Sequence, residues 1–177
     1  MKELSLHILD LAENSITAGA DHIQIRVDET HLNDQIRITV ADNGRGIDPE
    51  MLNLISDPFV TTRTTRRVGM GIALFKAAAE RCNGGFEIKS SKGKGTTISA
   101  TFGIDHIDRA PVGDMGETIT TLIAGYPEIG IRYDHILFRD SFTLNTDELK
   151  LELDEIELND PVVLTRIKEI INDFCNQ

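Results

Sequence analysis

The chain is poor in the residues that build disulfide-rich, zinc-stapled or membrane-spanning proteins. It has two cysteines and no tryptophan among 177 residues. Cys82 and Cys175 lie far apart, with no histidines at the intervals of a zinc site, so neither a disulfide framework nor a zinc centre is indicated. We expect reduced, partly buried thiols. No apolar run approaches the roughly 20 residues that cross a bilayer, and the N-terminus is typical of an amphipathic helix rather than a signal peptide. We therefore expect a cytoplasmic protein.

Basic residues are scarce in the second part of the chain. Residues 1–102 carry 12 Lys and Arg against 13 Asp and Glu, whereas residues 103–177 carry 6 against 16. This shift predicts a domain over 1–102 and an extension over 103–177. The acidic extension disfavours nucleic acid or an anionic membrane as the partner, because Lys and Arg are the side chains that bind phosphate backbones. We expect a protein partner with a basic surface, or a second copy of this chain.

Hydrophobic periodicity in residues 1–102 alternates between helical and strand spacing. Helices are expected at about 2–18, after Pro49 and at about 70–82, and strands at 23–27, 36–40, 86–88 and 98–102. Residues 56–68 have no apolar period and are expected to be irregular. This order of elements predicts an α+β fold, a two-layer α/β sandwich.

The extension is harder to read. Its patterns predict a helix over 116–125, short strands over 129–131 and 136–138, and a helix over 161–174. The apolar side of that last helix is expected to hold Val162, Leu164, Ile167, Ile170 and Ile171. Residues 147–160 contain seven acids and one lysine, which indicates either a solvated face or a linker.

The most informative segment is Asp42-Asn43-Gly44-Arg45-Gly46-Ile47, which follows a predicted strand. An adenine ring offers an exocyclic amine beside a ring-nitrogen acceptor, so the Asp42 carboxylate can accept from the amine while a water bridges the ring nitrogen. Gly44 and Gly46 let the backbone turn and let a flat base approach it. Taken alone, this motif is also a common turn.

Asp10 and Asn14 lie four residues apart on the first predicted helix, so their side chains share one face. An amide oxygen such as that of Asn14 is a serviceable Mg²⁺ ligand, and a carboxylate one turn earlier can orient or deprotonate an attacking water or hydroxyl. The same spacing also fits two polar residues on a solvated face. His7 lies on this stripe without an acidic neighbour, and we expect it to be structural or at the edge of a pocket.

A third motif combines Arg63, within the irregular stretch, with the Gly69-Met70-Gly71 turn that follows it. Arg63 can pair with a γ-phosphate, and Gly69-Met70-Gly71 opens a helix whose first amides favour phosphate charge. An RNA contact by this Thr- and Arg-rich stretch is disfavoured, because no aromatic residues are interleaved and the chain is acidic.

Gly93-Lys94-Gly95-Thr96 does not fit a Walker-type phosphate loop. It lacks the earlier glycine of that pattern and joins two predicted strands rather than a strand and a helix. Thr96 instead begins the last strand of the 1–102 domain, facing Asp42, where it can share an adenine-bound water.

Together, these motifs resemble the four boxes of the histidine-kinase-like ATPase superfamily, which also includes gyrase, mismatch-repair and chaperone ATPases. The N, G1, F and G2 boxes correspond to residues 10–17, 42–47, 58–63 and 69–74. DNGRGI, DPFVTTR and VGMGIAL are similar to a sensor kinase catalytic domain, whereas LAENSITAGA is closer to a mismatch-repair or gyrase ATPase. The resemblance implies the Bergerat ATP-binding fold, with ATP and Mg²⁺ as cofactors.

Residue roles also follow from the resemblance. Asp10 takes the place of the general base, Asn14 binds magnesium and nucleotide, and Asp42 binds adenine. The other nucleotide-binding positions are Gly44, Gly46, Ile47, Arg63, Gly69, Met70, Gly71 and Thr96. Two positions depart from the pattern: the hydrolysing and serine-kinase branches have Glu where this chain has Asp10, and the third glycine of the G2 box is Ala73. The shorter Asp10 bears on catalytic competence, and Ala73 bears on the stiffness of the lid or its approach to the phosphates.

Two functions from different classes remain open. The first is a stand-alone ATPase or protein kinase that uses Mg-ATP and acts with a separate protein. The second is a non-hydrolysing module that senses ATP or ADP and signals through protein contacts. We do not expect a self-contained sensor kinase, because the chain shows no dimerisation hairpin with a phosphoacceptor histidine before the N box.

Overall fold

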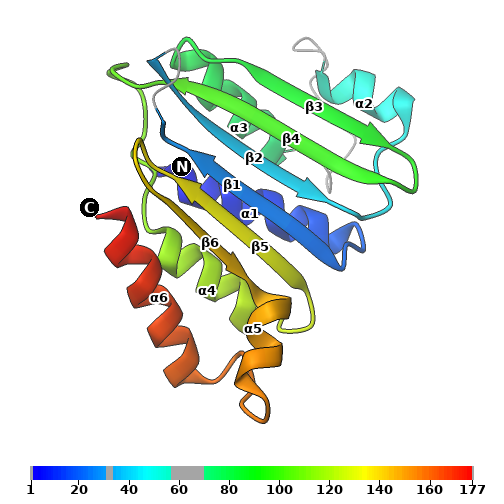
Figure 1. Ribbon diagram of the computed structural model, residues 1–177. Coiled ribbons are helices and arrows are strands. Elements are labelled where there is room, and N and C mark those ends of the chain that lie inside the picture. Colours follow the sequence, from blue (N-terminus) through cyan, green and yellow to red (C-terminus); the bar gives the residue numbers. More distant parts are fainter. Residues whose placement is uncertain (1, 31–33, 57–69, 177) are drawn as a thin grey trace.

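The computed structural model describes residues 2–30, 34–56 and 70–176, and for residues 53–56 it describes the helical backbone alone. Six helices and six strands lie in these ranges (Figure 1). In chain order they are α1 (Leu4–Thr17), β1 (His22–Asp28), β2 (Gln35–Asp42), α2 (Pro49–Ser56), α3 (Met70–Arg81), β3 (Phe86–Ser91), β4 (Gly95–Gly103), α4 (Met115–Gly125), β5 (Gly130–Ile136), β6 (Ser141–Asn145), α5 (Thr146–Leu153) and α6 (Pro161–Cys175).

The strands form one sheet in the order β3-β4-β2-β1-β5-β6. Neighbouring strands are antiparallel except β1 and β5, which run parallel. Helices α1, α3 and α4 cover one face of the sheet (Figure 1). This arrangement confirms the expected α+β two-layer sandwich.

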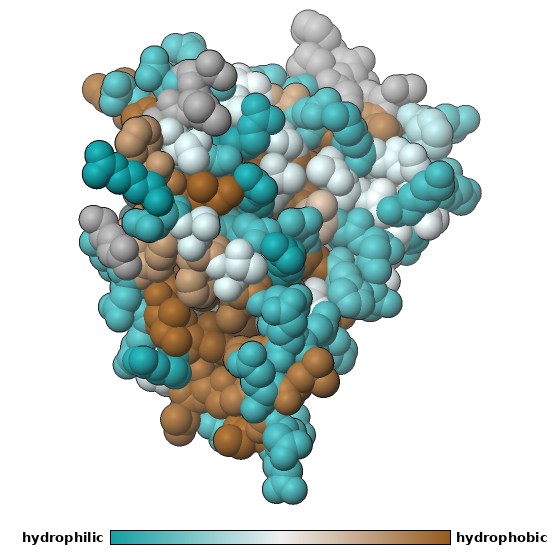
Figure 2. All heavy atoms as spheres, in the orientation of Figure 1, coloured by the Kyte–Doolittle hydropathy of each residue, from teal (hydrophilic) through white to brown (hydrophobic). Residues whose placement is uncertain are grey.

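Alternation along the strands explains the two layers. In β1, Ile23, Ile25 and Val27 are buried under the helices, while His22 and Gln24 point to the opposite face. An alternating strand can only cover one face with apolar groups, so the other face stays polar. Figure 2 shows polar side chains over much of that face, and apolar side chains gathered where α6, α5 and β6 meet.

Residues 103–177 extend the same sheet and the same core. Strand β5 pairs along the whole of β1, and α4 packs against α1. The first two backbone N–H groups of α1, at Leu4 and Ser5, donate to the carbonyls of Pro111 and Val112, at 2.9 and 2.7 Å. The loop before α4 therefore completes the N-terminus of α1, which lacks a side-chain cap. The domain division at residue 102 stays a prediction.

The two short strands expected over 129–131 and 136–138 are wrong. The structure has one strand, β5, over 130–136, followed by β6 over 141–145. Ile131, Tyr133 and His135 all point inward from β5 and are buried. The polar imidazole at an inward position hid the period-two pattern.

The expected apolar side of the last helix is wrong in part. Ile167 and Ile171 of α6 are buried, but Val162 is 77% exposed. Val162 lies in the first turn of α6, where its backbone N–H donates to the Asp160 cap. The acidic stretch 147–160 begins as helix α5, which Asn145 caps by accepting from the Asp147 N–H.

Among the helices that the structure describes, none is long and apolar enough to span a membrane.

Candidate functional site

The carboxylate of Asp42 is fixed by three hydrogen bonds. Asp42 ends β2, and its side chain points to the helix-covered face, opposite Thr96 of β4 in the register. Its Oδ1 accepts from the backbone N–H groups of Gly44 and Thr96, at 2.8 and 3.2 Å. Its Oδ2 accepts from the Ser15 hydroxyl of α1 at 2.8 Å. A polar group at an inward position of a strand is costly unless paired, and these bonds hold it in one orientation.

Ser15 is a site residue that the sequence analysis missed. It is buried in α1, and its hydroxyl also lies 3.2 Å from the carbonyl oxygen of Leu11, one turn earlier. A hydroxyl has one hydrogen, so Ser15 can donate either to Asp42 or to Leu11. Its position next to Asn14 in the N box was the available signal.

Two loops are packed together beside Asp42. Gly46 has φ +69°, and a Cβ there would lie 2.1 Å from the Ser91 carbonyl oxygen, so only glycine fits. The backbone N–H of Ile47 donates to the Ser90 hydroxyl oxygen at 2.8 Å. Ser90 donates in turn to the Gly95 carbonyl at 3.0 Å, so the Thr96 hydroxyl, 2.9 Å away, donates to Ser90. Ser90 is a second residue that the sequence analysis missed.

Asp10 and Asn14 meet the start of α3. Both side chains are half-buried, and Gly71 is buried directly against them. A Cβ on Gly71 would lie 1.6 Å from Asp10 Oδ2 and 3.4 Å from Asn14 Nδ2. The pair therefore lies at a helix–helix contact instead of on a solvated face. Glycine at this position lets the first turn of α3, with its free N–H groups, come next to both side chains.

An open cleft lies between α1, the loop after β2 and α2. It has a volume of about 280 Å³ and is lined by Asn14, Thr17, Ala18, Arg45, Gly46, Ile47, Asp48 and Met51. The predicted residues Asn14, Gly46 and Ile47 thus border one cavity. Its walls combine polar groups from α1 with the backbone of the G1 box.

His7 has the structural role that we expected for it. It is 4% exposed and packs on Phe75 of α3, with ring centroids 5.7 Å apart. Burial lowers the pKa of His7, which favours the neutral ring. Its Nδ1 has no hydrogen-bond partner among the described residues.

Two predicted positions, Arg63 and Gly69, lie outside the described residues, as does the irregular stretch except for residue 56. Met70, the first residue of α3, is described and is 79% exposed.

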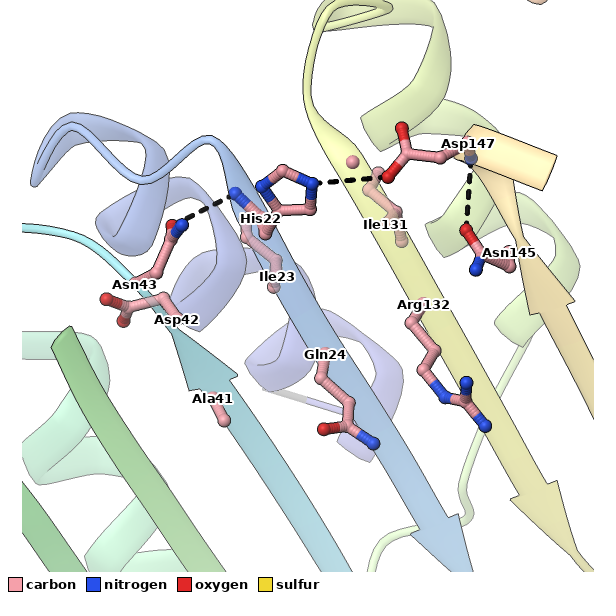
Figure 3. Close-up of a pocket in the computed structure, with 11 residues that line it drawn as sticks. His22, Ile23, Gln24, Ala41, Asp42, Asn43, Ile131, Arg132, Asn145 and Asp147 are labelled. Carbon is pink, nitrogen blue, oxygen red and sulfur yellow. Dashed lines mark hydrogen bonds and ion pairs between the residues drawn. The ribbon is translucent and has the colours of Figure 1, made fainter. Parts of the chain in front are cut away.

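A second cavity lies at the ends of β2, β1 and β5, and Asp42 lines this cavity instead of the cleft beside α1 (Figure 3). Its volume is about 340 Å³. Asn43 accepts from the backbone N–H of His22 at 3.0 Å, and the His22 ring lies 3.2 Å from the Asp147 carboxylate of α5. Hydrogen bonding to Asp21, with the charge of Asp147, raises the pKa of His22. Residues of the G1 box and of the extension therefore line the same cavity.

Comparison with known proteins assigns the family. Residues 2–106 match the model of the histidine kinase-, DNA gyrase B- and HSP90-like ATPases. The chain belongs to this ATPase family. The match covers α1, β1, β2, α2, α3, β3 and β4, so every element that carries Asp10, Asn14, Asp42, Gly71 or Thr96 lies within the family region.

Sensor kinases are among the relatives of this ATPase-family chain. The sensor protein kinase FleS of Pseudomonas aeruginosa is 36% identical over 110 residues, which cover 62% of this chain and 27% of FleS. Sensor histidine kinase ZraS of Escherichia coli is 29% identical over 106 residues, 60% of this chain and 23% of ZraS. The chain thus spans less than a third of the length of these relatives.

A solved structure described as the N-terminal domain of a DNA repair protein has the same fold. It aligns with a TM-score of 0.53 at 16% identity and covers 82% of this chain and 53% of that one. This ATPase fold therefore extends past residue 106 into the extension.

Proposed function

We propose that the chain binds ATP with Mg²⁺ in the cleft beside α1 and transfers or hydrolyses the γ-phosphate, acting with a separate protein. Membership of the ATPase family supports nucleotide binding and phosphoryl chemistry in general. The specific assignment rests on one observation: Asp42 is held at the inner end of β2 with both oxygens oriented by other groups.

The arrangement of Asp42 suits adenine. A carboxylate only accepts hydrogen bonds, so it fits the exocyclic amine of adenine and opposes the carbonyl oxygen that guanine has at the same place. Two oxygens offer about four acceptor positions, of which three are used inside the chain. One position is therefore left for a ligand donor, or two when Ser15 turns to Leu11.

The residues around Asn14 fit a magnesium ion. An amide oxygen and a nearby carboxylate are hard oxygen ligands of the kind that Mg²⁺ takes together with phosphates and water. Asn14 would hold the ion, which neutralises phosphate charge when bound. Asp10 is placed to orient a nucleophile, and glycine at position 71 leaves room that a side chain would fill.

A non-hydrolysing nucleotide sensor is the second candidate. The observation that favours it is the contact of Asp10 with Gly71: the shorter Asp side chain is held against α3, and the carboxylate reaches less far than a Glu would. In that case nucleotide binding would act through protein contacts alone.

The protein partner is proposed to be basic. Apolar side chains are exposed on the extension, among them Leu151, Ile156 and Val162, at 84, 54 and 77%. They lie among the acidic residues of α5, α6 and the turn between them. An apolar patch with an acidic rim fits a surface with apolar anchors and Lys or Arg around them.

The proposal is tested by nucleotide titration followed by an assay of chemistry. Calorimetry with Mg²⁺ should show binding of ATP and ADP and a weaker affinity for GTP. Labelled ATP then separates the two candidates, since a phosphoryl-transfer enzyme releases ADP and a sensor does not. Equal affinities for ATP and GTP would remove Asp42 from base recognition.

A further inference from the structure

Two groups from distant parts of the chain meet at one buried imidazole outside the nucleotide cleft. His135 of β5 is 1% exposed. Its Nε2 lies 2.8 Å from Oε1 of Glu29, just after β1. Its Nδ1 lies 3.3 Å from Sγ of Cys175, the last residue of α6. Thiol, imidazole and carboxylate are thus in series across the ring.

The surroundings of the ring strengthen these contacts. The Tyr133 and Phe174 rings each stand edge-on to His135 at a centroid distance of 5.8 Å. The Tyr133 hydroxyl also approaches Nδ1, at 2.6 Å, and burial raises the pKa of this phenol, so it stays neutral. Among the described residues, the titratable groups that face the imidazole are Glu29 just after β1, Cys175 of α6 and Tyr133 of β5. In an apolar enclosure, charge-assisted hydrogen bonds are stronger than in water.

The imidazole is held in its charged form. Burial lowers the pKa of His135, but the hydrogen bonds and charges of Cys175 and Glu29 outweigh burial and raise this pKa to about 9. With Nε2–H donated to Glu29, Nδ1 faces both the Tyr133 hydroxyl, at 2.6 Å, and the sulfur of Cys175, at 3.3 Å. Packing alone does not need this arrangement, since apolar residues can replace a buried charged group without loss of stability.

The other cysteine gives an internal contrast. Cys82 is buried at 2% exposure, and desolvation raises the pKa of its thiol. Cys175 is partly exposed at the end of α6, so its side chain borders solvent. Only one of the two thiols combines access with a histidine partner.

We propose that Cys175 is a reactive thiol, deprotonated by His135 and supported by Glu29, that forms mixed disulfides with low-molecular-weight disulfides. In the reacting form, the proton of the thiol is on Nδ1 of His135, and the sulfur is a thiolate. The thiolate attacks one sulfur of the small disulfide, a new S–S bond forms as the old one breaks, and the leaving thiolate takes the proton from the ring. One disulfide is consumed and one thiol released, so no further oxidant is required.

The test compares the two cysteines in the full chain. Reduced protein is treated with oxidised glutathione at pH 6.5 and 8.5, and adducts at Cys175 and Cys82 are followed by mass spectrometry. An ordinary thiol, with a pKa of about 8.5, loses roughly 50-fold in thiolate over this interval. The rate at Cys175 should fall by less than about threefold, and Cys82 should stay unmodified. A 50-fold fall at Cys175, or equal rates at both thiols, would overturn the proposal.

Substitutions identify the supporting groups. Glu29→Gln keeps the shape of the side chain and should slow the reaction at Cys175 about tenfold at pH 6.5. Glu87→Gln on β3 makes the same charge change far from the ring and should leave the rate unchanged, and Cys175→Ser should remove the adduct. An unchanged rate in a folded Glu29→Gln variant would contradict the role of the carboxylate. If a His135→Asn variant does not fold, the comparison of the rates at Cys175 at pH 6.5 and 8.5 in the parent protein still tests the proposal.

Discussion

At the scale of single residues, the orientation of Asp42 is set before any ligand arrives. Backbone N–H groups from two different segments and a hydroxyl from α1 converge on its two oxygens. Side chains that are already oriented lose little conformational entropy when a ligand binds, so this cost subtracts less from the binding free energy. This makes the site sensitive to a change of a single atom.

Asp42→Asn makes such a change. The amide nitrogen would face N–H donors or the amine of adenine, leaving buried donors mispaired at a cost of about 1–3 kcal/mol. ATP affinity measured by calorimetry should therefore fall by roughly 5- to 150-fold. Ser15→Ala removes a bond to the same carboxylate without adding a donor, and should change ATP affinity by less than about threefold. If both variants lose affinity equally, the carboxylate is structural instead of a ligand contact.

Asp10 and Gly71 should affect turnover more than binding. Asp10→Asn keeps size and removes the proton acceptor, so ADP release should slow by about 10²- to 10⁴-fold while ATP affinity is retained. Gly71→Ala places a methyl group on the Asp10 oxygen and turns that side chain away, so it should slow ADP release with a smaller change in unfolding temperature. Asn14→Ala should instead weaken magnesium-dependent ATP binding. An undiminished rate in Asp10→Asn would exclude its role as base.

The sequence predicted the local part of the site and missed its supports. Asp42 and Gly46 fall within one short motif, where a turn residue and a strand end are adjacent in the chain. Ser15 and Ser90 come from other elements and reach the motif only through the register of β2 with β4 and the packing of α1. Serine is common on every element, so Ser90 carried no signal without the fold, and the signal for Ser15 was its position next to Asn14.

At the scale of elements, the sequence predicted α1, α3, α6 and the strands of the family region, because each has an uninterrupted apolar period. It failed at β5, where the inward side chains include His135. Two of the partners of that imidazole, Glu29 and Cys175, lie 106 and 40 residues away in sequence. No local pattern encodes such a partner.

The same imidazole predicts a pH dependence of the attachment of α6. A group whose pKa is raised in the folded protein stabilises it fully below the unfolded value, near 6.5, and this contribution is lost as pH rises through about 9. The unfolding temperature should therefore fall between pH 7 and 9.5, by about 5 °C more in the parent than in Glu29→Gln. Calorimetric melting of both proteins checks this. Parallel curves would mean that Glu29 does not hold the charge on the ring.

At the scale of the whole molecule, most of the net charge of −11 lies on one part of the chain. Like charges on two copies repel at low ionic strength, where screening is weak. The chain should therefore be monomeric at about 20 mM salt by sedimentation, even though its apolar patch is exposed. A dimer at low salt that Leu151→Asp abolishes, and that Ile107→Asp on the β4–α4 turn does not, would show that the patch binds a second copy instead of a basic partner.

The extension packs against the elements of residues 1–102. Helix α6 packs along α4 and buries Ile167 and Ile171, and α4 lies on α1, which carries Asp10 and Asn14. Deleting residues 147–177 would uncover apolar surface of α4. The role of the extension is therefore better tested by surface substitutions than by truncation.

The parallel pairing of β1 with β5 also delays completion of the sheet during synthesis, because the two strands are far apart in the sequence. Strand β1 ends at residue 28, and its partner begins at residue 130. At roughly 5–20 residues per second, a ribosome needs on the order of 5–20 s to make the intervening chain. Throughout that time, one edge of β1 lacks its final neighbour and remains open to pairing with other nascent chains. Strand β1 therefore gains its second neighbour in the sheet, β5, only late in translation.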